Sequence, residues 1–134
     1  MKIAMVVVRT LMGLLFLMSS VTFFLMMAGV MQMPEMPDGP LKTFNEGLAA
    51  SSYFFVLLKI TEFVCGLLLL SGRFVPLAMV IISPVIINIV LTHAFLLPSG
   101  IGPGLFLMAG NIFLAYYYWD AFKPLLTAKY EKLV

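Results

Sequence analysis

Four long apolar stretches constrain the fold of this chain more than any other feature of its sequence. They run over residues 3–30, 52–71, 75–97 and 105–122. A helix needs about 20 apolar residues to cross the hydrocarbon core of a bilayer. Since 63% of the 134 residues are hydrophobic and 10% are charged, a soluble fold could not shield so much apolar surface from water. The sequence predicts an all-α integral membrane protein, a four-helix bundle that forms a single transmembrane domain.

The first connection, residues 31–51, differs in character from the spans around it. Its first half contains three prolines and a glycine, which oppose a continuous helix. Its second half, residues 41–50, carries Leu41, Phe44 and Leu48 at helical spacing, which predicts a short helix at the membrane interface. We expect this connection to be extracytoplasmic.

The other two connections are short. Residues 71–74 make a tight link, so the second and third spans should be antiparallel neighbours. Residues 98–104 are rich in glycine and proline and predict a turn before the fourth span, the shortest of the four.

The distribution of basic residues predicts the orientation in the membrane. Lys42 lies on one predicted side and Lys59 within the second span, whereas the others share the opposite side: Lys2, Arg9, Arg73, Lys123, Lys129 and Lys132. Basic residues accumulate on the cytoplasmic side of membrane proteins, so both termini are expected in the cytoplasm. The aromatic residues 116–119 and Tyr130 fit an interfacial belt on that side.

Ionisable residues within the second span are the first indication of a site. Lys59 and Glu62 are three residues apart and share a helix face, on which Gly66 would let another helix approach closely. Charges at this depth cost several kcal/mol unless they are paired or hydrated, so both should face the bundle interior or a wet cavity.

Arg9 in the first span is a second candidate cation for Glu62, because its long side chain could reach that depth. Arg9 also begins a stripe with Gly13, Phe16 and Ser20 that marks the expected interior face of the first span.

Three further polar residues lie within the third and fourth spans. Asn88 is at about the depth of Glu62, and His93 and Asn111 are nearer the outer surface. Pro84 and Asn88 share a face, which suits a kinked helix that lines a cavity. Two interpretations compete. The polar residues either form a buried network that fixes helix register, or they form a ligand or proton site in the outer half of the bilayer.

The composition excludes several functions. The single cysteine, Cys65, excludes an internal disulfide, a dithiol redox pair and a cysteine-based zinc site, and no metal site is expected. The basic residues are scattered, so nucleic acid is not an expected partner. No covalently bound cofactor is expected, and any redox chemistry would need a borrowed cofactor or a partner protein.

The motifs in the first three spans resemble those of a known family. The chain contains Arg9-x3-Gly13, then Leu58-Lys59-Ile60-x-Glu62-x3-Gly66, then Ile87-Asn88-Ile89 followed by His93. This order resembles the DoxX family of small bacterial membrane proteins. The resemblance implies a four-helix inner-membrane protein with Arg9, Lys59, Glu62, Asn88 and His93 as site positions. It leaves the activity open, since some relatives are linked to quinone-coupled thiosulfate oxidation, some to redox-stress complexes, and distant eukaryotic ones to cargo or chaperone roles.

Three functions are consistent with these observations. The leading hypothesis is an accessory protein that binds a quinone, a lipid or a membrane partner around Lys59 and Glu62, since Lys59, Asn88 and His93 could donate hydrogen bonds beside an apolar slot. The second is a membrane subunit of a quinone-linked oxidoreductase with a soluble redox partner. The third is a structural or chaperone-like protein whose polar residues only hold the bundle together. The sequence does not decide among them, nor whether the chain is catalytic or forms a homo-oligomer.

Overall fold

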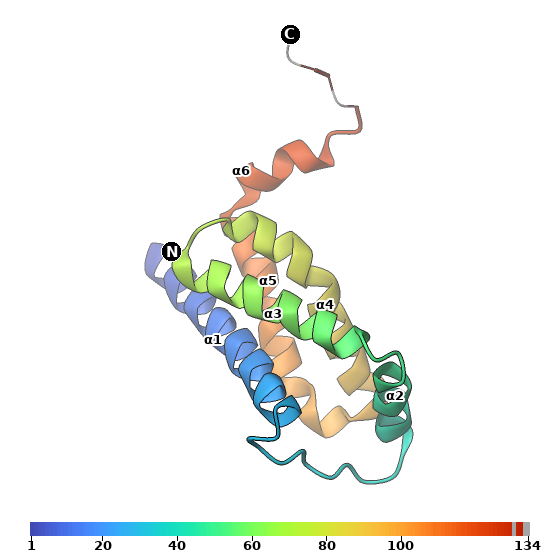
Figure 1. The fold of residues 1–134 in the computed structure, drawn as a ribbon. Helices are drawn as coiled ribbons and strands as arrows, with labels where there is room; N and C mark the ends of the chain where they lie inside the picture. Colours follow the sequence, from blue (N-terminus) through green and yellow to red (C-terminus); the bar gives the residue numbers. More distant parts are fainter. Residues whose placement is uncertain (130, 133–134) are drawn as a thin grey trace.

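Four long apolar helices pack side by side in the computed structural model, which describes residues 1–129 and 131–132 (Figure 1). These helices are α1 (Lys2–Met27), α3 (Phe54–Ser71), α4 (Val75–Leu96) and α5 (Ile101–Tyr117). Each is long and apolar enough to cross a membrane, α5 together with the short η1 turn (Pro98–Gly100) before it. Contacts run from α1 to α3, α3 to α4, α4 to α5 and α5 back to α1, which closes the bundle. The predicted all-α membrane bundle is confirmed.

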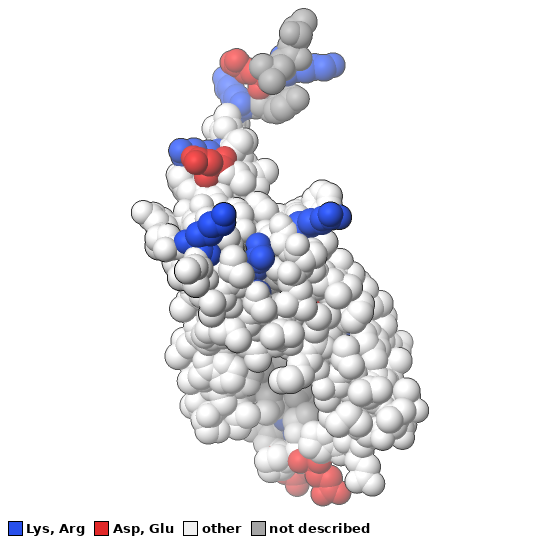
Figure 2. Space-filling view, turned by 90° about the vertical axis from the view of Figure 1, so that its left-hand side faces the viewer, with Lys and Arg blue, Asp and Glu red and all other residues white. Residues whose placement is uncertain are grey.

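The two ends of the bundle differ in structure and charge. The N-terminus lies at the end from which α6 (Trp119–Phe122) and η2 (Lys123–Leu126) project, and α2 (Pro40–Ala49) lies at the other (Figure 1). On the face drawn in Figure 2, Lys and Arg side chains gather toward the first end, with Asp120 paired to Lys123 among them, while acidic side chains gather at the second. The start of α1 and the segment α6–η2 therefore both lie at the basic end of the bundle. Tyr130, from the predicted aromatic belt, lies outside the described residues.

The connection between α1 and α3 follows the prediction in part. The helix predicted for residues 41–50 is present as α2, with Pro40 in its first turn, where a missing N–H costs nothing. The span predicted for residues 3–30 ends three residues early, at Met27, because Gly29 adopts a left-handed conformation with φ of 79°. The next span begins at Phe54, two residues later than expected, after Ser52 with φ of 65°.

The fourth span corrects the sequence prediction most clearly. It was expected over residues 105–122 after a turn at 98–104, but α5 begins at Ile101 and ends at Tyr117. Pro103 is tolerated because the first-turn N–H groups of a helix have no intrahelical partner. A Cβ on Gly104 would lie 3.3 Å from the Ile89 side chain, so this glycine lets the first turn of α5 pack on α4. The glycine and proline residues thus begin a helix here.

The backbones of α1 and α3 approach each other closely at two glycines. A Cβ on Gly13 would lie 3.0 Å from the carbonyl oxygen of Gly66, and a Cβ on Gly66 would lie 3.1 Å from that of Gly13. The predicted close approach at Gly66 is confirmed, and Gly13, Phe16 and Ser20 are all buried. This crossing fixes the depth of α1 against α3, and with it the position of the polar residues one to two turns away.

Candidate functional site

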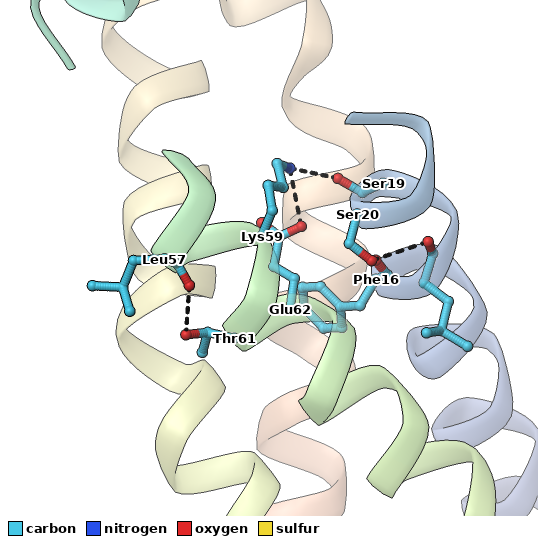
Figure 3. Close-up of polar contacts among 8 residues, drawn as sticks. Phe16, Ser19, Ser20, Leu57, Lys59, Thr61 and Glu62 are labelled. Atoms are coloured by element: carbon cyan, nitrogen blue, oxygen red, sulfur yellow. Dashed lines mark hydrogen bonds and ion pairs between the residues drawn. The ribbon is translucent and has the colours of Figure 1, made fainter. Parts of the chain in front are cut away.

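The ion pair between Lys59 and Glu62 lies inside the bundle. Lys59 Nζ is 3.0 Å from Glu62 Oε2, and their side chains are only 17% and 4% exposed. Both come from α3, where a spacing of three residues places them on one face. This face turns toward α1, as Figure 3 shows. Burying an isolated charge at this depth would cost several kcal/mol, and the opposite charge of the partner residue offsets that cost for both side chains.

Ser19 on α1 completes this polar cluster. The Lys59 ammonium donates a hydrogen bond of 2.7 Å to Ser19 Oγ (Figure 3). Sequence reasoning missed Ser19, because the interior stripe of α1 passes through the adjacent Ser20. Ser20 is buried, but its hydroxyl donates to the carbonyls of Phe16 and Leu17 in its own helix. The sequence did contain a signal for Ser19, since it is a second serine next to the stripe, in the half of α1 that lies beside Lys59.

Arg9 does not take part in the cluster. Its guanidinium packs against the α3–α4 turn, where a Cβ on Gly72 would lie 2.8 Å from Arg9 Nη1. Arg9 Nε is buried and has no hydrogen-bond partner among the described residues. Two cations were proposed as partners for Glu62, and the structure pairs it with Lys59. Arg9, on α1, lies instead beside Gly72 at the C-terminal end of α3.

Asn88 is likewise absent from the cluster. Its side chain is exposed on the outer face of α4, and it makes no hydrogen bond with any described residue. The sequence places Asn88 at about the depth of Glu62, but depth carries no information about which way a helix is rotated. The interior face of α4 carries apolar residues instead, among them Ala78, Ile82 and Ile86.

Asn111 and His93 make separate contacts. Asn111 Nδ2 donates to Ser83 Oγ at 2.9 Å, joining α5 to α4, while Asn111 Oδ1 is buried without a partner among the described residues. His93 Nδ1 lies 2.8 Å from the carbonyl oxygen of Ile89 in its own helix. The six predicted site residues thus divide into the Lys59–Glu62 pair, an α4–α5 link, and three residues that stand apart.

A pocket of about 450 Å³ opens beside the ion pair; we call it the lateral pocket. Lys59 and Glu62 line it together with residues of α1, α4 and α5, including Ser19, Thr22 and Leu107. Its remaining walls are apolar except for hydroxyl groups. Met18, Ser19 and Pro103 at its margin are exposed, so it opens through the side of the bundle that faces lipid.

A second cavity lies between this pocket and the acidic end of the molecule. It has a volume of about 590 Å³ and is lined by the end of α1, the 33–36 segment, α2 and the start of α3. We call it the outer cavity. Lys59, Phe23 and Met26 line both spaces. Lys59 therefore lies at the boundary between the lateral pocket and the outer cavity.

The side chains of Lys59, Glu62 and Ser19 can form hydrogen bonds and exchange protons. Within residues 1–129 and 131–132, no three His, Cys, Asp or Glu side chains are grouped as a metal site would require. Cys65 is buried and unpaired. The arrangement can hold a polar group by an ammonium, a carboxylate and a hydroxyl at the base of an apolar pocket.

The family assignment follows from a comparison with protein-family models. The DoxX family model matches residues 4–94, about two thirds of the chain. That range contains Ser19, Lys59 and Glu62 and ends before α5 begins. No curated protein and no solved structure matches the chain. The protein is a multi-pass membrane protein that belongs to the DoxX family.

Proposed function

We propose that the lateral pocket binds the polar head of an uncharged amphiphile dissolved in the membrane, with a quinone as the best candidate. The observation that carries this proposal is the position of Lys59 at the base of a pocket that opens toward lipid. The protein would then serve as an accessory, ligand-holding component of an assembly in a bacterial inner membrane. Both termini and the basic end would face the cytoplasm.

The hydrogen-bond inventory supports a site with unused capacity. An ammonium group has three donors, and Lys59 uses two of them, toward Ser19 and Glu62. The third donor has no partner among the described residues. A quinone carbonyl needs one such donor beside an apolar slot, and a pocket of about 450 Å³ is within the range of small-molecule sites.

The balance of charge favours an uncharged ligand over an anionic headgroup. Lys59 is the only cation among the residues that line the lateral pocket, and Glu62 neutralises it at 3.0 Å. A phosphate would meet the Glu62 carboxylate in a medium of low dielectric constant, where like charges repel strongly. A carbonyl or hydroxyl head avoids this repulsion.

The same pair also bears on the alternative role as a membrane subunit of a quinone-linked oxidoreductase. A carboxylate and an ammonium beside a bound quinone could exchange the protons that accompany its reduction. In this role the electrons would come from a partner protein that holds a redox centre. A co-purifying flavin, haem or iron–sulfur protein would favour this role.

A thermal-shift experiment with the purified protein in mild detergent tests the proposal. A short-chain quinone at about 100 times its dissociation constant should stabilise the protein by about 2.7 kcal/mol. Lys59→Met should abolish the shift, and so should Thr22→Trp, which fills the pocket and leaves the ion pair in place. Ile112→Trp is the matched control, because Ile112 is 63% exposed on α5 and does not line the pocket.

The same experiment separates the third role, a purely structural ion pair. In that case neither a quinone nor an extracted lipid would raise the stability of the wild type by more than it raises the stability of the Thr22→Trp variant. Lys59→Met would still lower the stability of the ligand-free protein, because it leaves Glu62 without its partner.

A further inference from the structure

The outward face of α4 carries a seam of residues at heptad spacing. Six exposed residues follow one another at intervals of four, three, four, three and four: Leu77, Ile81, Pro84, Asn88, Leu91 and Phe95. α4 packs mainly on α3 and α5, with further contacts to α2 and η1 at its Leu96 end, and the six side chains of the seam remain exposed among the described residues. Intervals alternating between three and four residues place side chains on the line along which two parallel helices pack at about 20°.

Asn88 makes this seam unlike an ordinary lipid-facing surface. It lies about 12 Å from the Leu96 end of α4 and about 20 Å from the Val75 end, well within the hydrocarbon region. Its carboxamide has two donor hydrogens and an acceptor oxygen, and none of the described residues satisfies them. Polar groups that face hydrocarbon without a partner are costly, and asparagine side chains in membrane helices hydrogen-bond to neighbouring helices instead.

We propose that two copies of this chain form a dimer through α4, with the two Asn88 side chains hydrogen-bonded to each other across a twofold axis. A carboxamide complements itself, since each copy can donate one N–H and accept the other. Copies that share one membrane topology are related by an axis along the membrane normal, so their α4 helices run parallel and Asn88 meets Asn88 at equal depth. This inference is independent of ligand binding, because the lateral pocket opens between α1 and α5.

The other seam residues fit the same arrangement. With Ile81, Asn88 and Phe95 at one set of core positions, Leu77, Pro84 and Leu91 occupy the other. Ile81 at the first set and Leu77 and Leu91 at the second are the residue types that favour two strands, and a single asparagine at the first set fixes register. Asn88 thus favours a pair in which the two α4 helices lie in register.

Cysteine crosslinking in native membranes tests the register. Ile81→Cys and Leu91→Cys should each form disulfide-linked dimers under mild oxidation, at least fivefold more than Ile112→Cys, an exposed position on α5. The native Cys65 is 1% exposed on α3 and should not contribute. Equal crosslinking at Ile112 and at the two seam positions would overturn the proposal.

Energy transfer between labelled copies, diluted stepwise into lipid, tests the role of the carboxamide. Asn88→Leu should raise the dimer dissociation constant about 3- to 30-fold, and Asn88→Gln should restore part of the loss. Unchanged helix content by circular dichroism shows that Asn88→Leu still folds, as expected for an apolar side chain facing lipid. An unchanged dissociation constant for Asn88→Leu, or a wild type that stays monomeric at high density in the membrane, would overturn the proposal.

Discussion

Lys59 and Ser19 are 40 residues apart in the chain, yet the ammonium of Lys59 lies 2.7 Å from the hydroxyl of Ser19. This hydrogen bond joins α3 to α1 in the half of the bundle nearer α2, while the contact between Gly13 and Gly66 joins the same helices closer to the end from which α6 projects. The two contacts hold the Lys59–Glu62 pair against the lateral pocket. The predictions below follow from this geometry.

Removing the charge of Glu62 should destabilise the bundle. Glu62→Gln leaves the Lys59 ammonium without its counter-ion in a largely buried site, and we expect a loss of about 1–3 kcal/mol in reversible unfolding from detergent. The double variant Lys59→Met with Glu62→Leu should recover most of this loss, since it leaves no unpaired charge.

The exposed pair Asp120–Lys123 provides the control, because it has the same spacing of three residues. The hydrogen bond from Lys123 and its charge lower the pKa of Asp120, so this pair is intact at pH 7. Its contribution is lost only as the pH falls through that lowered pKa. Asp120→Asn should leave the stability of the bundle unchanged at pH 7. Equal losses for Glu62→Gln and Asp120→Asn would contradict the buried role of Glu62.

Adjacent serines on α1 should respond differently to substitution. Ser19→Ala removes a hydrogen bond between helices, so we expect a loss of about 0.5–1.5 kcal/mol. Ser20→Ala removes only bonds to carbonyls of the same helix, and its effect should be smaller. The measurement is unfolding of both variants under the same conditions, and a larger loss for Ser20→Ala would count against the Ser19 contact.

The crossing of α1 and α3 should not tolerate even a methyl group at Gly66. In Gly66→Ala the added Cβ would lie 3.1 Å from the Gly13 carbonyl oxygen, which should force the helices apart and cost about 1–3 kcal/mol. Gly47→Ala is the control, because a Cβ there would meet no atom within 4 Å and Gly47 lies within α2. That substitution should be neutral or stabilising by up to about 1 kcal/mol. The prediction is wrong if the two variants unfold alike.

The charge difference between the two ends predicts a topology. Reporter fusions active only in the cytoplasm should function after residue 129, and reporters active only outside should function within residues 31–39. Replacing Lys2 and Arg73 by glutamine should lower the fraction of correctly oriented protein, because the basic end would lose part of its cytoplasmic bias. Cytoplasmic activity of the 31–39 fusion in the wild type would reverse the assignment.

Much of the fold could be predicted from sequence because hydrophobic length is a strong signal. The spans of α1, α3 and α4 were predicted to within three residues at each end. The start of α5 was not, because glycine and proline were interpreted as turn residues. Gly104 is instead buried against α4, and Pro103 occupies the first turn of the helix. A local propensity gave way here to packing between helices.

The site was predictable only where it rests on spacing within one helix. Lys59 and Glu62 pair because residues three apart share a face, and this can be read from one segment. Asn88 and Arg9 were wrongly joined to them because the rotation of α4, and the direction that a long arginine takes, depend on packing that no single segment encodes. Ser19 was missed for the same reason, since its role depends on which residue of α3 lies opposite.

The most direct test is to extract the lipids that remain bound after purification from native membranes in mild detergent. Chromatography and mass spectrometry should find a quinone at close to one molecule per wild-type chain, with a similar amount in Ile112→Trp and little in Thr22→Trp. A wild type that carries no quinone, or a Thr22→Trp variant that carries as much as the wild type, would contradict ligand binding in the lateral pocket.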